Sequence, residues 1–185
     1  MSQRLGPRFT KLWAAAGISN LGDGIMMVAF PLVVASITRD PLLVAGATVA
    51  NRIPWLLFAL PSGALVDRLD RKRVMVVTDG FRAVVVSLLG LMLLAGDVGL
   101  PVIYAIGFLL GLAETFFDTS SEAILPALVP SDLLPSANGR LQATEWIGNA
   151  FVGPPFGAFL FAVTAGLPFL VDGGTFVVAA LLVAM

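Results

Sequence analysis

Three acidic residues recur at every fourth position in one apolar stretch of the chain: Glu114, Asp118 and Glu122. Side chains spaced by four residues lie along one face of a helix, so these carboxylates would form a stripe. Like charges on one face repel each other, and removal from water further disfavours the ionised form of a carboxylate. At least one of the three is therefore expected to be protonated near neutral pH, as a proton carrier requires. Glu122 lies near one end of the stretch and could instead contact basic residues there.

A second set of ionisable residues, Asp23 and Arg52, lies deep inside two consecutive apolar stretches. At the rise of a helix, Asp23 would lie roughly 17 Å and Arg52 roughly 21 Å from the same end of the molecule. At this similar depth the two side chains could pair, either as an ion pair that only fixes helix register or within a cavity that binds substrate. Glycines flank Asp23 on both sides, which would let backbone and water approach it, so we favour the cavity.

The stretches that hold these residues predict an all-α membrane protein. The sequence is 58% hydrophobic and only 12% charged, with a mean hydropathy of +0.95, whereas an ordinary soluble domain carries about 25% charged residues. A membrane-spanning helix needs about 20 apolar residues, so 185 residues can hold about six. We predict one domain, residues 1–185, with spans at about 12–38, 42–66, 74–95, 102–125, 137–163 and 167–185.

Ionisable residues inside such spans are costly and indicate function unless they are paired. Glu145, in the fifth span, is a further candidate for the cavity. Asp79 and Arg82 stand three residues apart in the third span, and we expect them to form a local ion pair.

The composition also limits the chemistry. The chain contains no Cys and no His, which excludes a disulfide framework, thiolate and imidazole metal sites, and Ser-His or Cys-His nucleophiles. Any proton chemistry must then fall to carboxylates. We expect no enzyme activity, no metal, no cofactor and no nucleic-acid partner.

The basic residues predict the orientation of the helices. With the N-terminus inside the cell, the inner ends and loops collect eight of the eleven bases, and the outer loops hold only Arg39. The eight are Arg4, Arg8, Lys11, Arg68, Arg71, Lys72, Arg73 and Arg140. The bias predicts an integral protein of the cell membrane with its N-terminus inside.

A charged hairpin between the second and third spans has the pattern Gly63-x-Leu65-x-Asp67-Arg68-x-x-Arg71-Lys72. This pattern resembles the signature loop between spans 2 and 3 of the major facilitator superfamily of secondary transporters. The family usually has Gly where this chain has Asp70, a departure associated with its drug and siderophore exporters, the enterobactin and macrolide types. The resemblance implies that Gly63 permits close helix approach, and that Asp67, Arg68, Arg71 and Lys72 latch two transporter halves together. The bases alone would also be explained as an orientation signal.

The fifth span contains Gly153-Pro154-x-x-Gly157, which resembles the glycine-proline motif of proton-driven exporters. The match is partial, because the upstream glycine is Gly148 rather than one at position 149, and Ala158 replaces the last glycine. The resemblance implies export. A kinked helix that packs through small residues is the alternative.

The resemblance extends from Phe9 to Met185 and covers one half of the family's twelve-span fold. It implies a secondary active transporter: proton-coupled efflux of a small amphipathic molecule, a drug or a siderophore, by alternating access. Asp23, Arg52 and Glu114 would face the cavity. Its apolar lining would come from Trp55, Phe58, Phe117 and Trp146. The alternatives are a lysophospholipid or lipid flippase of the same superfamily and a non-transporting scaffold.

Six spans supply only one wall of such a cavity. We therefore expect a second partner, either the C-terminal six-helix half of a longer protein or a second copy of this chain. We favour a truncated product.

Overall fold

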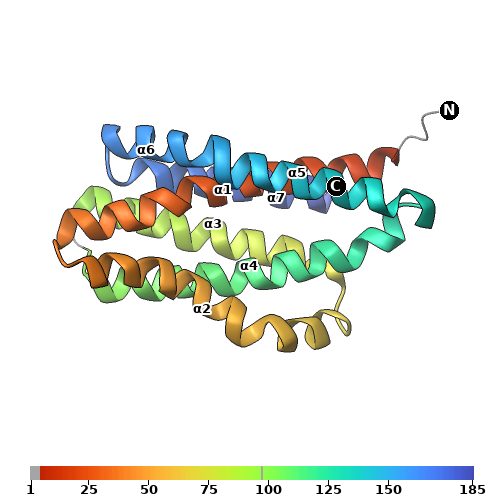
Figure 1. Ribbon diagram of the computed structural model, residues 1–185, viewed down its shortest axis with the longest axis horizontal. Coiled ribbons are helices and arrows are strands. Elements are labelled where there is room, and N and C mark those ends of the chain that lie inside the picture. Colours follow the sequence, from red (N-terminus) through yellow and green to blue (C-terminus); the bar gives the residue numbers. More distant parts are fainter. Residues whose placement is uncertain (1–4, 97) are drawn as a thin grey trace.

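The computed structural model describes residues 5–96 and 98–185 and consists of helices packed side by side (Figure 1). Arg4 lies outside the described residues. The helices are α1 (Gly6–Ile37), α2 (Pro41–Val66), α3 (Arg71–Ala95), α4 (Leu100–Leu128), η1 (Ser131–Leu133), α5 (Leu134–Trp146), η2 (Ile147–Val152), α6 (Gly153–Val163) and α7 (Leu167–Ala184). Because η1 through α6 run as one segment, the described residues form six helical spans that are long and apolar enough to cross a membrane. The predicted all-α six-span fold is confirmed.

Local sequence explains where the helices begin and end. Asp40 and Asp70 cap α2 and α3, since their carboxylates accept hydrogen bonds from the backbone N–H groups of Leu42 and Arg73, both at 2.9 Å. Gly96 ends α3 in the left-handed conformation, with φ of 83°, which glycine adopts without strain. The helices extend beyond the predicted spans: the first begins at Gly6 rather than residue 12, and the fifth span begins at Ser131 rather than residue 137.

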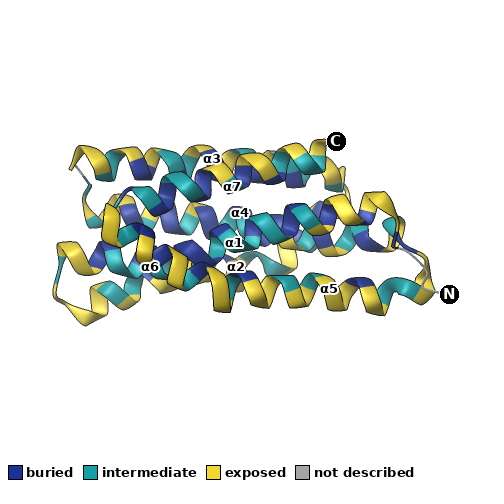
Figure 2. Cartoon of the chain, turned by 90° about the horizontal axis from the view of Figure 1, so that it is seen from above, coloured by how far each residue is buried: buried dark blue, intermediate teal, exposed yellow. Residues whose placement is uncertain are grey.

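The core lies where α1, α3, α4 and α7 meet (Figure 2). Ile25, Phe30 and Val33 of α1 pack there with Leu89 of α3 and Phe176 of α7. The helix α2 packs mainly on α4 at one flank, and η2 and α6 pack on α1 at the other. Both flanks expose large apolar side chains, including Leu60 of α2 and Phe151 of η2, which are 90% and 70% exposed. In a membrane protein such surfaces face lipid or another helical unit.

Glycines bring the fifth span against α1. Gly153 lies on the backbone of Gly24, and Gly157 lies on the backbone of Ile25, leaving no room for a Cβ atom at either glycine. Between Ile147 and Val152 the segment forms a π-helical turn. Small residues allow such close approach of membrane helices. The Gly-Pro motif is therefore a packing surface within this chain.

Gly63 behaves differently from the expectation. A Cβ atom built there meets nothing within 4 Å, so Gly63 makes no close helix contact in the described part of the chain. The C-terminal part of α2 lies at the edge of the bundle (Figure 1), where the hydroxyl of Ser62 lies 3.1 Å from that of Thr119 on α4 while the space beside Gly63 stays open. The expected close approach at this glycine is not seen.

We predict that Gly157→Leu lowers the free energy of unfolding by about 1–3 kcal/mol, because the larger side chain must displace the backbone of α1. Thermal unfolding of purified protein in detergent measures this. Gly174→Leu is the matched control, since Gly174 is an exposed helical glycine with open space around it. Equal melting temperatures for the two variants would contradict the packing role of Gly157.

Candidate functional site: a polar cavity inside the bundle

A cavity of about 140 Å³ lies inside the helix bundle. Each of the six spans contributes at least one polar side chain to its wall. These include Asp23 (α1), Arg52 (α2), Arg82 (α3), Glu114 (α4), Asn149 (η2) and Asp172 (α7). Met26 and Phe30 of α1 and Leu110 of α4 are among its apolar lining residues. A small hollow that combines apolar walls with a few convergent polar groups is typical of a ligand site.

Arg82 forms the centre of the polar wall. Its side chain is only 1% exposed, and its guanidinium forms an ion pair and hydrogen bond with Asp23 of α1. Asp79, one helical turn earlier, lies 3.6 Å from a second guanidinium nitrogen. Arg82 also donates a hydrogen bond to Ser19 Oγ at 3.4 Å and lies 3.9 Å over the ring of Phe176. A charge this deep is stabilised only by such partners.

The expected pairing of Asp23 with Arg52 is wrong in its partner. Asp23 pairs with Arg82, and Arg52 is exposed at the cavity wall without an ion pair within 4 Å among the described residues. Similar depth on neighbouring helices was a sound argument for a shared cavity, but depth does not say which way a side chain points. The local pair between Asp79 and Arg82 is present, although it is the longer of the two ion pairs that Arg82 makes.

Sequence reasoning missed Asp172. This residue is fully buried in α7 at the cavity wall, and the hydroxyl of Thr175 donates a hydrogen bond to its Oδ1 at 3.1 Å. A lone acid in the last apolar stretch was the available signal, because an ionisable residue in a span indicates function by default.

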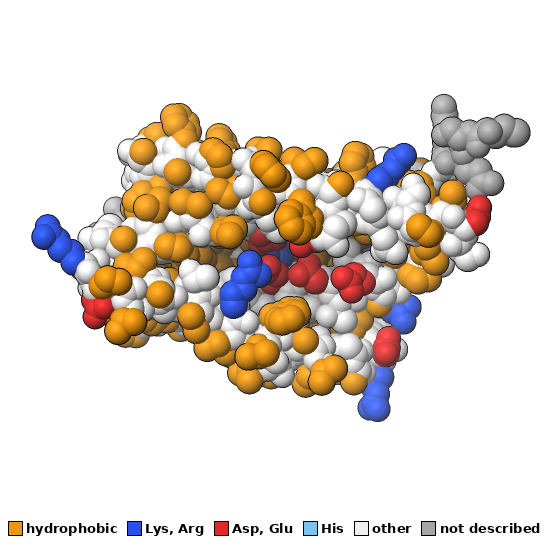
Figure 3. Space-filling view, viewed as in Figure 1, with side chains coloured by type: hydrophobic (Ala, Val, Ile, Leu, Met, Phe, Trp, Pro, Cys, Tyr) orange, Lys and Arg blue, Asp and Glu red, His pale blue; other side chains and the backbone are white. Residues whose placement is uncertain are grey.

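The acidic stripe of α4 is divided between two hollows. Glu114 lines the cavity described above, whereas Asp118 and Glu122 line a second hollow of about 440 Å³ together with Glu145 of α5. Gln142 donates a hydrogen bond to Glu145 at 3.0 Å. Figure 3 shows acidic side chains gathered in the middle of this face, bordered by hydrophobic ones. The stripe therefore forms an acidic surface that continues from the first cavity.

The predicted apolar lining is present only in part. Trp55 and Phe117 line the second hollow, whereas Phe58 and Trp146 line neither hollow. Trp55 and Trp146 are 61% and 62% exposed.

The π-helical turn η2 places Asn149 in the cavity wall. Its side-chain Oδ1 atom is buried and has no hydrogen-bond partner among the described residues. π-Helical turns occur frequently at functional sites. Asn149 therefore offers an unused polar group to a bound molecule.

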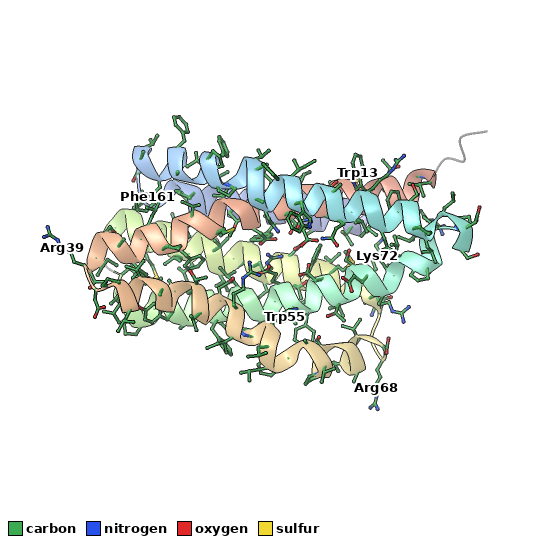
Figure 4. All side chains as sticks on the ribbon, in the orientation of Figure 1. Trp13, Arg39, Trp55, Arg68, Lys72 and Phe161 are labelled. Atoms are coloured by element: carbon green, nitrogen blue, oxygen red, sulfur yellow. The ribbon has the colours of Figure 1, made fainter. Side chains whose placement is uncertain are left out.

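The charged hairpin lies at the opposite end of the bundle from Arg39 (Figure 4). Asp67 and Arg71 form an exposed ion pair at 3.4 Å. Lys72 donates a hydrogen bond to the backbone carbonyl of Ala184 at the end of α7, at 2.8 Å. Arg68 points away from the bundle in Figure 4. The hairpin thus contacts α7 on one side and leaves Arg68 available to a partner.

Comparison with known proteins agrees with this architecture. A family model described as "Transmembrane secretion effector" (MFS_3) matches residues 5–185. The chain is 31% identical over 168 residues to the multidrug efflux pump Tap of Mycolicibacterium fortuitum, covering 88% of this chain and 40% of that protein. Macrolide efflux protein A of Streptococcus pyogenes is 25% identical over 156 residues, 84% of this chain and 38% of that protein. Enterobactin exporter EntS of Shigella boydii is 28% identical over 174 residues, which cover 92% of this chain and 41% of that protein. The chain spans about two fifths of the length of these relatives.

We predict that Arg82→Gln lowers the free energy of unfolding by about 3–5 kcal/mol, because it leaves the Asp23 carboxylate buried without its cation. Adding Asp23→Asn should recover part of the loss. Both are measured by thermal unfolding in detergent, with Arg52→Gln as the control that leaves the melting temperature unchanged. If Arg52→Gln were as damaging as Arg82→Gln, burial of Arg82 could not be the cause.

Proposed function

We propose that this chain, which belongs to the MFS_3 family of transmembrane secretion effectors in the major facilitator superfamily, supplies the N-terminal half of a proton-coupled exporter of small amphipathic molecules. Membership in this transporter family, together with six apolar spans, makes it an integral membrane protein. The relatives Tap, macrolide efflux protein A and EntS are a multidrug efflux pump, a macrolide efflux protein and an enterobactin exporter. We extend that substrate class to this chain.

The observation that carries the proposal is the ion pair between Arg82 and Asp23 in the wall of the cavity. An ionisable residue inside a span is costly and is a candidate for function by default, and this pair lies in the wall of the cavity. Carboxylates beside the cavity, Asp23 and Glu114 among them, can exchange protons with water that enters it. Protonation would favour one access state and substrate the other, which is the thermodynamic basis of exchange.

The chain requires a second helical unit to close the cavity. The acidic hollow and the exposed Trp55 and Trp146 lie on surfaces that no other part of the described chain covers. We propose that a second six-helix half covers them, as the greater length of the relatives suggests, with a second copy of the chain as the alternative.

Alternating access would then involve the charged hairpin. Asp67 and Arg68 are exposed at one end of the bundle, where they can bind the second half in one access state. The same end carries most of the described bases, so we propose that it faces the interior of the cell and that the protein resides in the cell membrane.

The polar wall of the cavity favours an exporter over a lipid flippase or a scaffold. A lipid pathway needs an apolar route, whereas Arg52, Glu114 and Asn149 all face this cavity. A scaffold needs no cavity of this kind.

The test of the function is substrate-driven proton release. The chain alone, and the chain joined to a second six-helix half, are purified in detergent and titrated with a macrolide or enterobactin. We expect release from the joined protein, lost in Asp23→Asn and in Glu114→Gln and kept in Asp132→Asn, whose exposed carboxylate lies in η1 outside the cavity. Absence of release from the unaltered joined protein would exclude proton-coupled export of these two probes.

The proposed contact of the charged hairpin with the second half has its own test. We predict that Asp67→Asn lowers the transport rate roughly tenfold, equivalent to about 1.4 kcal/mol, because it removes a carboxylate from the end of the bundle without touching the cavity. Initial rates in everted vesicles are compared with direct binding of the same substrate. Unchanged affinity with a slower rate is expected, and Arg140→Gln is the control. A weaker affinity at an unchanged rate would place Asp67 in substrate binding instead.

A further inference from the structure

The buried wall of the cavity holds more acid than base. Asp23, Asp172 and Arg82 line the cavity, and Asp79 lies 3.6 Å from the guanidinium of Arg82 without being part of the lining. The side chains of Asp79, Asp172 and Arg82 are at most 1% exposed. If all three carboxylates were ionised, the group would carry a net charge of −2 inside an apolar bundle. Such a charge is compensated by neighbouring cations or by protons.

Asp172 is the only ionisable residue of α7, and α6, which packs on it, contains none. The other two helices packed on α7 present Asp23 from α1 and Asp79 and Arg82 from α3. Their remaining bases line no part of the cavity: Arg8, Lys11, Arg71, Lys72 and Arg73, of which Lys72 bonds to Ala184 at the end of α7.

Across the cavity stand Glu114 of α4, another acid, and Arg52 of α2, which is exposed. The acids of the cavity wall therefore outnumber its described bases, and a proton bound to one carboxylate would compensate part of the excess.

The surroundings of Asp172 leave room for a proton. The hydroxyl of Thr175 lies 3.1 Å from Oδ1 and 2.8 Å from the backbone carbonyl oxygen of Asp172, whereas the buried Oδ2 has no partner among the described residues. A buried carboxylate oxygen without a donor is expensive when ionised, but a protonated Oδ2 carries its own hydrogen. Asp79 lacks hydrogen-bond partners on both oxygens, although Arg82 lies 3.6 Å from its Oδ1.

Gly22 makes this arrangement possible. The carboxylate of Asp172 and the hydroxyl of Thr175 occupy the space that a side chain at position 22 would fill. Phe176, one turn after Asp172 on the same face of α7, stacks on the guanidinium of Arg82. Asp172 thus lies against Gly22, the residue before Asp23, and lines the same cavity as Asp23 and Arg82.

We propose that Asp172, in addition to the cavity carboxylates Asp23 and Glu114, binds an exchanged proton, and that Arg82 is its positioning partner. This rests on the proposed function. In the protonated state a proton from cavity water is bonded to Asp172 Oδ2, and Arg82 stays with Asp23. When the proton returns to water, the ionised Asp172 competes with Asp23 for Arg82. Proton uptake forms the O–H bond at Asp172 Oδ2 and proton release breaks it, and cavity water is the only other reactant.

The test uses infrared difference spectra of the purified chain between acidic and alkaline pH. A carboxylic acid C=O band that shifts in heavy water and is lost in Asp172→Asn, but kept in Glu114→Gln, is the expected result. Persistence of the band in Asp172→Asn would overturn the proposal. If Asp172→Asn does not fold, Thr175→Val serves instead. It replaces the hydroxyl that lies 3.1 Å from Oδ1 by a methyl group, so the polarity beside the carboxyl group falls and the band must move. An unmoved band would also overturn the proposal.

Proton release by the joined protein separates this inference from the function it rests on. Loss of both the band and substrate-driven release in Asp172→Asn supports the proposal. Loss of the band with release intact overturns the coupling role of Asp172 and leaves the exporter standing. If the unaltered protein releases no proton, the exporter proposal fails, and with it the coupling role of Asp172. The band then decides only whether Asp172 binds a proton.

Discussion

The structure depends on one buried guanidinium. Arg82 projects from α3 into an apolar interior where it must have partners, and these come from three helices: the carboxylate of Asp23 and the hydroxyl of Ser19 on α1, Asp79 on α3 itself, and the ring of Phe176 on α7. A buried charge with fixed partners admits few alternative packings. We interpret the arrangement of α1, α3 and α7 around the cavity as a consequence of this requirement.

The sequence predicted the framework because hydropathy is a strong signal over 20 or more residues. The six spans, and the gathering of acids within them, follow from it. Hydropathy does not show which way each side chain points around the helix axis. Asp23 and Arg52 have similar depth, yet Asp23 turns toward α3, and only the packed bundle decides that. Asp172 stands alone in its span, so no spacing to a second ionisable residue predicts where its side chain points.

Glycines allow close packing between some helices of the chain but not between all of them. Gly24 meets Gly153, and Gly90 of α3 lies on the backbone of Gly166 just before α7, so α1, α3, α6 and α7 approach closely. Gly63, near the end of α2, has no such close contact among the described residues. Its role in the motif that resembles the family's loop stays a prediction.

The π-helical turn at Ile147–Val152 makes the length of the fifth span a constraint in itself. Each residue of a helix advances the side chains by about 100° around its axis. If the segment kept its length but adopted ordinary helical hydrogen bonding, α5 would rotate relative to α6 by about that angle, because a π-helical turn takes up one more residue than an α-helical turn. Glu145 would then leave the acidic hollow, or Gly153 would leave its place on Gly24, even though every side chain remained. The length of this segment and its π-helical conformation are therefore linked, and a change in one requires a change in the other.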